Sequence, residues 1–399
     1  MNQNTPSGSP EAVGRHLLRS GALSSDWLAA YQAVPRDAFV PDAIWPGRAG
    51  GNHQGRRVLR SEEPELWWDV VHSDVPITTQ WDDGTYDGST PGRIASSSSS
   101  MPTMVFSMLG ALDTQPGNRV LEIGTGNGWN TALLCHRLGD KQVFSVEIDG
   151  GLAREAEERL RCAGYAPRIR TGDGAEGYPG QSAFDRVIAT CSARYIPSQW
   201  IAQCRPSGVI VAPWGPVYGG EAVVRLTIDE RGVGSGSFVR SSAFMSMRDQ
   251  RRTLPATNKY VDMADWPGGG RRSSTSVSPD GVGDWIHMFA IGVQVPDLFC
   301  RVQQLEGRSY RLWLFDTGIT SWATADYSDG RGSYGVVQQG PRSLWDELEV
   351  SWLWWEKQGR PGFERFGLTT RGGSKYTPNQ RVWLDSPENP VPVRAAHAD

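Results

Sequence analysis

The sequence predicts an α/β protein with a parallel, Rossmann-like sheet, and three observations support this prediction. A short apolar run, Val120–Ile123, leads into the glycine-rich segment Gly124–Gly128. An apolar pattern with helical spacing follows, and it ends at Gly139. A second apolar run, residues 143–146, then ends on Glu147. Together these features predict a strand, a loop, a helix and a second strand that closes with a carboxylate.

The glycine-rich segment indicates a nucleotide site. Glycine leaves the backbone uncovered, so a ligand can approach the N terminus of the following helix. Glu147 follows Gly128 by 19 residues, close to the ~20 at which an acidic side chain meets ribose hydroxyls. From the residues alone, a nucleotide-free core with the same order of elements remains the alternative.

The glycine pattern differs from that of a dinucleotide site. Such a site needs a small residue at position 129, and this chain has Trp129. The segment has the form E-x-G-x-G-x-G, starting at Glu122. A carboxylate beside the loop would repel a pyrophosphate and favour a cationic ligand. The pattern resembles motif I of S-adenosylmethionine-dependent methyltransferases, whose cofactor carries an ammonium and a sulfonium. That resemblance implies contacts from Glu122, Gly124, Thr125, Gly126, Asn127, Gly128, Glu147 and Ile148.

Composition excludes several other classes. The 399 residues carry a net charge of −4, which predicts neither nucleic acid nor an anionic membrane as partner. We find no signal peptide and no apolar run long enough to cross a membrane. Five scattered cysteines without a C-x-x-C pair indicate neither disulfides nor a metal site. We therefore expect a cytoplasmic protein.

Motifs outside the glycine segment point to one family. Val34–Pro41 has the form V-P-R-x-x-F-V-P, which by itself would be a packing segment. Residues 71–77 and the S-x-P of Ser100–Pro102 follow in order. These motifs, continuing to about residue 250, resemble protein-L-isoaspartate O-methyltransferases. The resemblance implies a class I methyltransferase core, S-adenosylmethionine as cofactor, and a protein or peptide substrate that bears aspartate or isoaspartate.

Two later strand ends add expected cofactor contacts. The resemblance implies that Gly172, Asp173 and Gly174 recognise the adenine; a turn closed by the aspartate is the alternative. The strand over residues 184–190 ends at Thr190 and Cys191, where ligands of such sheets bind. We do not expect a nucleophilic role for Cys191, because methyl transfer requires no covalent step.

The serine run 96–100 supplies the expected catalytic residues, Ser100 with Ser99 beside it. The run could be a flexible linker, but the apolar helix pattern that follows favours a helix entry for its last members, with Ser100 just before Pro102. A carboxylate acceptor is already ionised at neutral pH and needs no general base. A hydroxyl at position 100 could orient it; a simple helix N-cap is the alternative.

We expect four segments. Residues 1–95 form a helical, substrate-side segment, and residues 96–263 form the methyltransferase core with a following β-hairpin. Residues 264–283 form a linker or long loop. Residues 284–399 form a tryptophan-rich α+β domain, with a strand over 289–295 and a helix over 344–358.

Two acceptors are compatible with these motifs. Our main hypothesis is the side-chain carboxylate of an aspartate in a ribosomally synthesised, post-translationally modified peptide (a lanthipeptide, graspetide or lasso peptide), whose ester would cyclise to an aspartimide and could open to isoaspartate. It rests on resemblance: the long C-terminal extension, the altered segment 81–95 and the serine-rich form of S-x-P. The alternative is methylation of L-isoaspartate in damaged proteins. A methyltransferase for another acceptor and a non-catalytic, cofactor-binding scaffold are the remaining possibilities.

Overall fold

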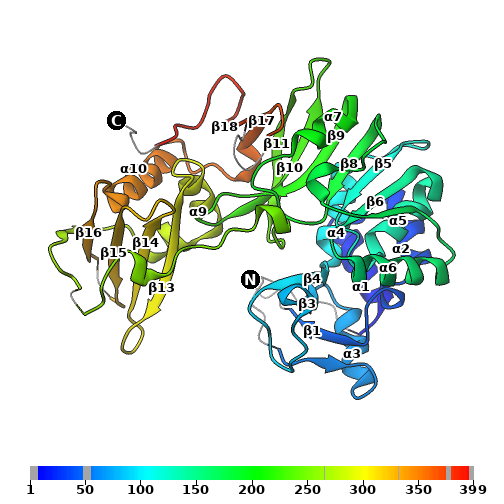
Figure 1. Cartoon of the computed structure of the whole chain (residues 1–399), viewed down its shortest axis with the longest axis horizontal. Coiled ribbons are helices and arrows are strands. Elements are labelled where there is room, and N and C mark those ends of the chain that lie inside the picture. The colour runs from blue at the N-terminus through cyan, green and yellow to red at the C-terminus, as the bar shows by residue number, and fades with distance from the viewer. Residues whose placement is uncertain (1–7, 48–54, 265, 331, 374–378, 395–399) are drawn as a thin grey trace.

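The computed structural model describes residues 8–47, 55–264, 266–330, 332–373 and 379–394. Within these residues the chain forms sheets of four, nine and five strands. Figure 1 shows the nine-stranded sheet with its helices at one end, the five-stranded sheet with α10 at the other, and the four-stranded sheet near α4 and α1. The expected α/β class, with an additional C-terminal sheet, is confirmed.

The large sheet has a parallel centre and an antiparallel flank, in the order β18-β17-β11-β10-β9-β8-β5-β6-β7. Its central strands are buried on both faces between two apolar cores, which explains their uninterrupted apolar runs. The parallel strands are β5 (Val120–Ile123), β6 (Val143–Glu147), β7 (Arg168–Thr171), β8 (Phe184–Ala189) and β9 (Cys204–Trp214). The antiparallel strands are β10 (Glu221–Ile228), β11 (Gly234–Ser242), β17 (Phe366–Thr370) and β18 (Gln380–Leu384).

Helices cover both faces of this sheet. One core joins the N-terminal helices to α4 and α5, and Trp129 at the start of α5 donates its indole N–H to the Val34 carbonyl at 3.1 Å. This contact explains a bulky residue where a dinucleotide site would have a small one. The helices are α1 (Pro10–Arg19), α2 (Ser25–Ala33), α4 (Pro102–Leu112), α5 (Trp129–Leu138), α6 (Gly150–Cys162) and α7 (Ser198–Gln203).

The N-terminal segment contains a sheet that the sequence did not predict. Its order is β2-β1-β3-β4, and α3 packs against it. Residues 96–99 of the serine run form part of strand β4, which the sequence did not predict, because they pair with β3. Ser100 lies after this strand and just before α4, which begins at Pro102 with Met101 as its N-cap residue. The elements are β1 (Ala43–Pro46), β2 (Val58–Leu59), α3 (Pro64–Val71), β3 (Ile77–Trp81), η2 (Asp82–Gly84) and β4 (Ala95–Ser99).

The C-terminal region differs from the expectation in three places. The proposed linker contains β12 and α8, and β12 closes one edge of the five-stranded sheet β12-β16-β15-β14-β13. The strand expected over 289–295 is largely helix α9. Strands β17 and β18 return to the methyltransferase sheet, so the boundary near 284 does not separate two independent units. The remaining bounds are β12 (Arg271–Thr275), α8 (Pro279–Gly283), α9 (Trp285–Gly292), β13 (Leu298–Gln304), β14 (Tyr310–Asp316), β15 (Trp322–Tyr327), β16 (Tyr334–Gln339) and α10 (Leu344–Lys357).

Helix α10 covers the expected helix over 344–358 and packs an aromatic face inward. Trp345, Leu348 and Trp355 are buried, and Trp352 is partly buried. Ser343 precedes the helix and makes no side-chain cap bond; its hydroxyl accepts from Arg271 instead, at 2.7 Å. No helix among the described residues is long and apolar enough to span a membrane.

Candidate active site

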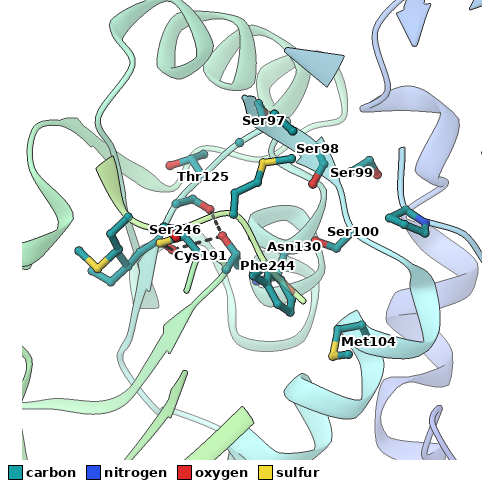
Figure 2. Close-up of a pocket in the computed structure, with 18 of the residues that line it drawn as sticks. Ser97, Ser98, Ser99, Ser100, Met104, Thr125, Asn130, Cys191, Phe244 and Ser246 are labelled. Carbon is teal, nitrogen blue, oxygen red and sulfur yellow. Dashed lines mark hydrogen bonds between the residues drawn. The ribbon is translucent and has the colours of Figure 1, made fainter. Parts of the chain in front are cut away.

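A cavity of about 780 Å³ lies where β5, β6 and β8 end, between the glycine segment and the serine strand. Figure 2 shows residues of both segments around it, with Thr125 and Cys191 on one side and Ser100 and Met104 on the other. The cavity is long enough to touch two groups of residues: the expected cofactor residues, and an apolar group from α4 and the chain after β11. Expected site residues that line it are Ser99, Ser100, Gly124, Thr125, Gly126, Asn127, Glu147, Ile148, Asp173, Gly174, Thr190 and Cys191.

The glycine segment can only be built from glycine at its tightest point. Gly124, Gly126 and Gly128 have φ values of +93°, +54° and +92°, which L side chains rarely adopt. A Cβ on Gly124 would lie 2.6 Å from Thr190 Oγ1, a clash. Thr190 itself donates to the Gly124 carbonyl. The segment is therefore shaped by the end of β8 as well as by its own sequence.

Glu147 organises the loop from the end of β6. Its Oε2 accepts from the Gly126 amide at 2.8 Å, and its Oε1 accepts from the Asp149 amide at 3.1 Å. Burial raises the pKa of Glu147. Asp149 in turn caps α6 by accepting from Gly151 and Leu152. Each carboxylate oxygen of Glu147 retains a free lone pair, which suits a ribose diol.

Glu122 does not lie where we expected it. Its side chain is fully buried and does not line the cavity. Its oxygens accept from Asn130 at 2.7 Å, Ser145 at 2.7 Å and Thr131 at 2.5 Å. Burial raises the pKa of Glu122 to about 7. Glu122 therefore joins β5, β6 and the start of α5 beneath the loop, and it does not present a charge to a ligand.

The strand ends carry the remaining expected residues. Asp173 lines the cavity and also accepts from the Ala175 amide at 2.9 Å, so the turn that we weighed as an alternative is present too. Gly172 and Gly128 do not line the cavity. Burial raises the pKa of the Cys191 thiol to about 12, which keeps it protonated and unreactive at neutral pH.

Arg36 holds the serine strand against the cavity. Its Nε donates to Ser99 Oγ at 3.0 Å, and its Nη2 donates to the carbonyls of Ser99 and Ser100 at 3.0 and 2.9 Å. Three further bonds reach the carbonyls of Val71, Ser73 and Val75. Burial lowers the pKa of Arg36 to about 9.

The two candidate serines differ in the direction and the partners of their hydroxyl groups. The hydroxyl of Ser99 is buried and committed to Arg36. Figure 2 shows the hydroxyl of Ser100 on the cavity side and that of Ser99 directed away. The V-P-R motif, which physics alone presents as packing, is thus a positioning device for Ser100. The sequence signal that could have suggested it is the arginine between Pro35 and Pro41.

Ion pairs close the end of the cavity that holds Glu147. Arg248 contacts Asp149 at 3.0 Å and Asp83 at 3.1 Å, and Arg251 contacts the same Asp83 at 2.9 Å. Asp83 belongs to η2, so the segment between β3 and β4 reaches across to the chain after β11. Sequence reasoning missed these pairs because their members lie far apart in the chain.

The chain matches known proteins over this site. The sequence model of the family described as protein-L-isoaspartate(D-aspartate) O-methyltransferase matches residues 75–251. A protein-L-isoaspartate O-methyltransferase of Methylorubrum extorquens (strain PA1) is 33% identical over 233 residues, which cover 57% of this chain and 85% of the relative. This chain belongs to the protein-L-isoaspartate O-methyltransferase family. A second relative, from Caulobacter vibrioides (strain NA1000 / CB15N), is 37% identical over 50% of this chain and 72% of its own.

Membership of this family makes the protein an S-adenosylmethionine-dependent carboxyl methyltransferase, in place of a non-catalytic scaffold. A solved structure titled protein-L-isoaspartate O-methyltransferase has the same fold, with a TM-score of 0.50 and 17% identity, and it covers 95% of this chain and 100% of its own. The match to this solved structure therefore extends over most of the C-terminal region as well.

Proposed function

We propose that this protein methylates the free α-carboxylate of L-isoaspartyl residues in proteins or peptides. One observation carries the proposal: the S-x-P segment lies on the cavity, opposite the glycine loop, and Arg36 fixes it there through Ser99 and the Ser100 carbonyl. A hydroxyl held in this way can orient a carboxylate without taking a proton from it. The name of the family and of its curated relatives supports the same acceptor.

The residues at the glycine end fit the cofactor of this family. We assign the ribose hydroxyls to Glu147, because one of its oxygens accepts from the loop amide of Gly126, the other accepts from the amide of Asp149, and both keep acceptor capacity. Ile148, which is 38% exposed and lines the cavity, and Asp173 would hold the adenine. The loop from Gly124 to Asn127 would hold the amino-acid end. When bound, the cofactor supplies an electrophilic methyl group.

The chain's own residues then perform two tasks. Ser100 orients one oxygen of an acceptor that is already ionised, since free carboxyl groups have pKa values near 4. Apolar side chains of α4 and the chain after β11, Met104, Met108 and Phe244, exclude water from the acceptor end. No side chain needs to remove a proton, which is consistent with the protonated thiol of Cys191. Alignment and exclusion of water account for the rate.

The product ester is activated for a second step that needs no enzyme group. The amide nitrogen of the next residue attacks the ester carbonyl, a C–N bond forms, the bond to methoxide breaks, and the amide proton leaves with it as methanol. The product is a five-membered succinimide. Hydrolysis of this ring would return a share of the residues to normal aspartate.

A second candidate acceptor is an aspartate side chain in a ribosomally synthesised, modified peptide, which would give an aspartimide. Two observations favour it. The unusual segment 81–95 borders the cavity through the ion pairs of Asp83, and Trp285 of the C-terminal region lines the cavity directly. The length of the chain supports neither acceptor, because the solved structure of similar fold spans nearly all of it.

Mass spectrometry with S-adenosylmethionine tests the assignment. Three substrates are compared: an isoaspartyl peptide, the same peptide with normal aspartate, and a modified lanthipeptide, graspetide or lasso precursor that carries an aspartate. We expect the isoaspartyl peptide alone to gain a methyl group and then lose methanol. Turnover of the precursor alone would replace the proposal with peptide maturation. Turnover of none of them, with S-adenosylhomocysteine still binding, would contradict both.

A further inference from the structure

The acceptor end of the cavity contains a cation with no anionic partner. Among the described residues that line the cavity, the positively charged side chains are Arg240, Arg248 and Arg251. Arg248 and Arg251 are committed to Asp83 and Asp149. Arg240 forms no ion pair within the described chain. Unlike the charges of Arg248 and Arg251, its charge is therefore available to a ligand.

The contacts of Arg240 leave most of its donors unused. Its Nη1 donates to Ser107 Oγ on α4, while its Nε is buried and has no hydrogen-bond partner among the described residues. Asp74 is the carboxylate whose charge acts on Arg240. Both oxygens of Asp74 are already occupied, by the amide of Thr103 at 2.8 Å and by its hydroxyl at 2.7 Å.

A β-bulge turns Arg240 toward this end of the cavity. In the pairing of β10 with β11, Phe238 lies opposite Val224 and Arg240 lies opposite Val223, which leaves Val239 as an extra residue. Phe238 and Val224 belong to one core, and Val223 belongs to the core on the α4 face. Residues two apart in a regular strand share a face of the sheet. Without the extra residue, Arg240 would therefore lie on the same face as Phe238, away from α4. Bulges of this kind commonly re-aim a side chain beside a site.

We propose that Arg240 binds the carboxylate of the acceptor residue and thereby selects a carboxylate over a carboxamide. A planar guanidinium with unused donors matches a carboxylate in shape and charge. Methylation converts that carboxylate to a neutral ester, so Arg240 holds the substrate and releases the product. This inference rests on the proposed function, since it takes the acceptor to be the carboxylate that is methylated.

Binding measurements test this role apart from turnover. In the presence of S-adenosylhomocysteine, calorimetry compares an isoaspartyl peptide with its α-carboxamide analogue, in the wild-type protein and in Arg240→Gln and Arg240→Lys. We expect the wild-type protein to prefer the acid at least about tenfold, Arg240→Gln to lose the preference, and Arg240→Lys to restore part of it. The affinity for S-adenosylhomocysteine should stay the same, and in turnover KM should rise while kcat changes little.

Arg225→Gln is the matched control. Arg225 lies on the neighbouring strand β10 and donates to the Ala111 carbonyl of α4 at 2.9 Å, but it does not line the cavity. It should keep the preference for the acid. Equal loss of acid and amide binding in Arg240→Gln, or an unchanged preference, would overturn the role of Arg240.

A second peptide pair separates this inference from the proposed function. The same calorimetry is run with an aspartyl peptide and its asparaginyl analogue. If the preference for an acid depends on Arg240 in this pair alone, the proposed acceptor is wrong and the role of Arg240 stands. If the wild-type protein prefers the acid in neither pair, the role of Arg240 is overturned, whatever the turnover assay gives.

Discussion

The two ends of the cavity carry opposite charge. The end formed by the glycine loop is lined by Glu147 and Asp173, with Asp149 paired to Arg248 at its border. The other end has Arg240 on its wall and Arg36 directly behind the serine strand. A cationic cofactor and an anionic acceptor would each meet the end that stabilises them. If the proposed ligands bind in this way, charge as well as shape would align them.

The two ends also differ in how the chain assembles them. Residues 120–149 supply most of the cofactor end in one strand–loop–helix–strand unit. The acceptor end is assembled from Arg36, β4, α4, the chain after β11 and Trp285, which are separated by up to about 250 residues of sequence. We therefore expect substitutions at the acceptor end to disturb several segments at once.

The largest effect should follow from Arg36→Gln. The variant leaves several buried carbonyls without a donor, so we expect the free energy of unfolding to fall by about 4 kcal/mol, measured by urea denaturation. Turnover should fall with it, while S-adenosylhomocysteine affinity of the folded fraction should be kept. Arg137→Gln, which removes a similar bridging arginine far from the cavity, should lower stability without lowering kcat. Loss of cofactor affinity in Arg36→Gln would contradict the separation of the two ends.

The pH dependence of stability should reveal Glu122. Its folded pKa, about 7, lies above its ordinary value of 4.5, so the folded state holds the proton more tightly between these values. Stability from this group is present at low pH and is lost as pH rises from about 4.5 to about 7, by about 3 kcal/mol in total. Glu122→Gln should flatten that slope in urea denaturation across pH 5 to 8. The exposed Glu158→Gln should leave it unchanged; an unaltered slope in Glu122→Gln would contradict the buried role.

Gly124→Ala should weaken cofactor binding about 100-fold, measured by calorimetry with S-adenosylhomocysteine. The new methyl group would lie 2.6 Å from Thr190 Oγ1. Gly139→Ala is the control, because Gly139 has a similar φ, +87°, and a Cβ there meets nothing within 4 Å. Both variants should lose about 1 kcal/mol of stability from backbone strain. Equal cofactor affinity in the two variants would mean that the close approach to Thr190 has no effect.

The smallest and most local contrast is between the two serines. Ser100→Ala should lower kcat about tenfold with stability unchanged, because one charge-assisted hydrogen bond to the acceptor is lost. Ser99→Ala should instead lower stability by about 1 kcal/mol, since Arg36 loses an acceptor. Steady-state kinetics and thermal unfolding distinguish the two patterns. The reverse pattern would assign the catalytic hydroxyl to Ser99.

The sequence by itself determined the cofactor end. Period, glycine spacing and the acidic residue after the second strand are local signals, and three residues that they indicate, Gly124, Gly126 and Glu147, line the cavity. Of the expected cofactor residues, Glu122, Gly128 and Gly172 do not line the cavity. For Glu122 the reason is that sequence spacing places a carboxylate near a loop but does not determine the direction of its side chain. Three donors and complete burial turned it away from the ligand.

Only the tertiary structure decided the acceptor end. Residues 96–99 became part of a strand because they pair with β3, and a single sequence does not reveal that pairing. The return of β17 and β18 to the central sheet, the bulge that aims Arg240, and the bonds from Arg36 are all contacts between distant segments. Such contacts depend on which surfaces are buried together, and local sequence pattern carries little information about that choice.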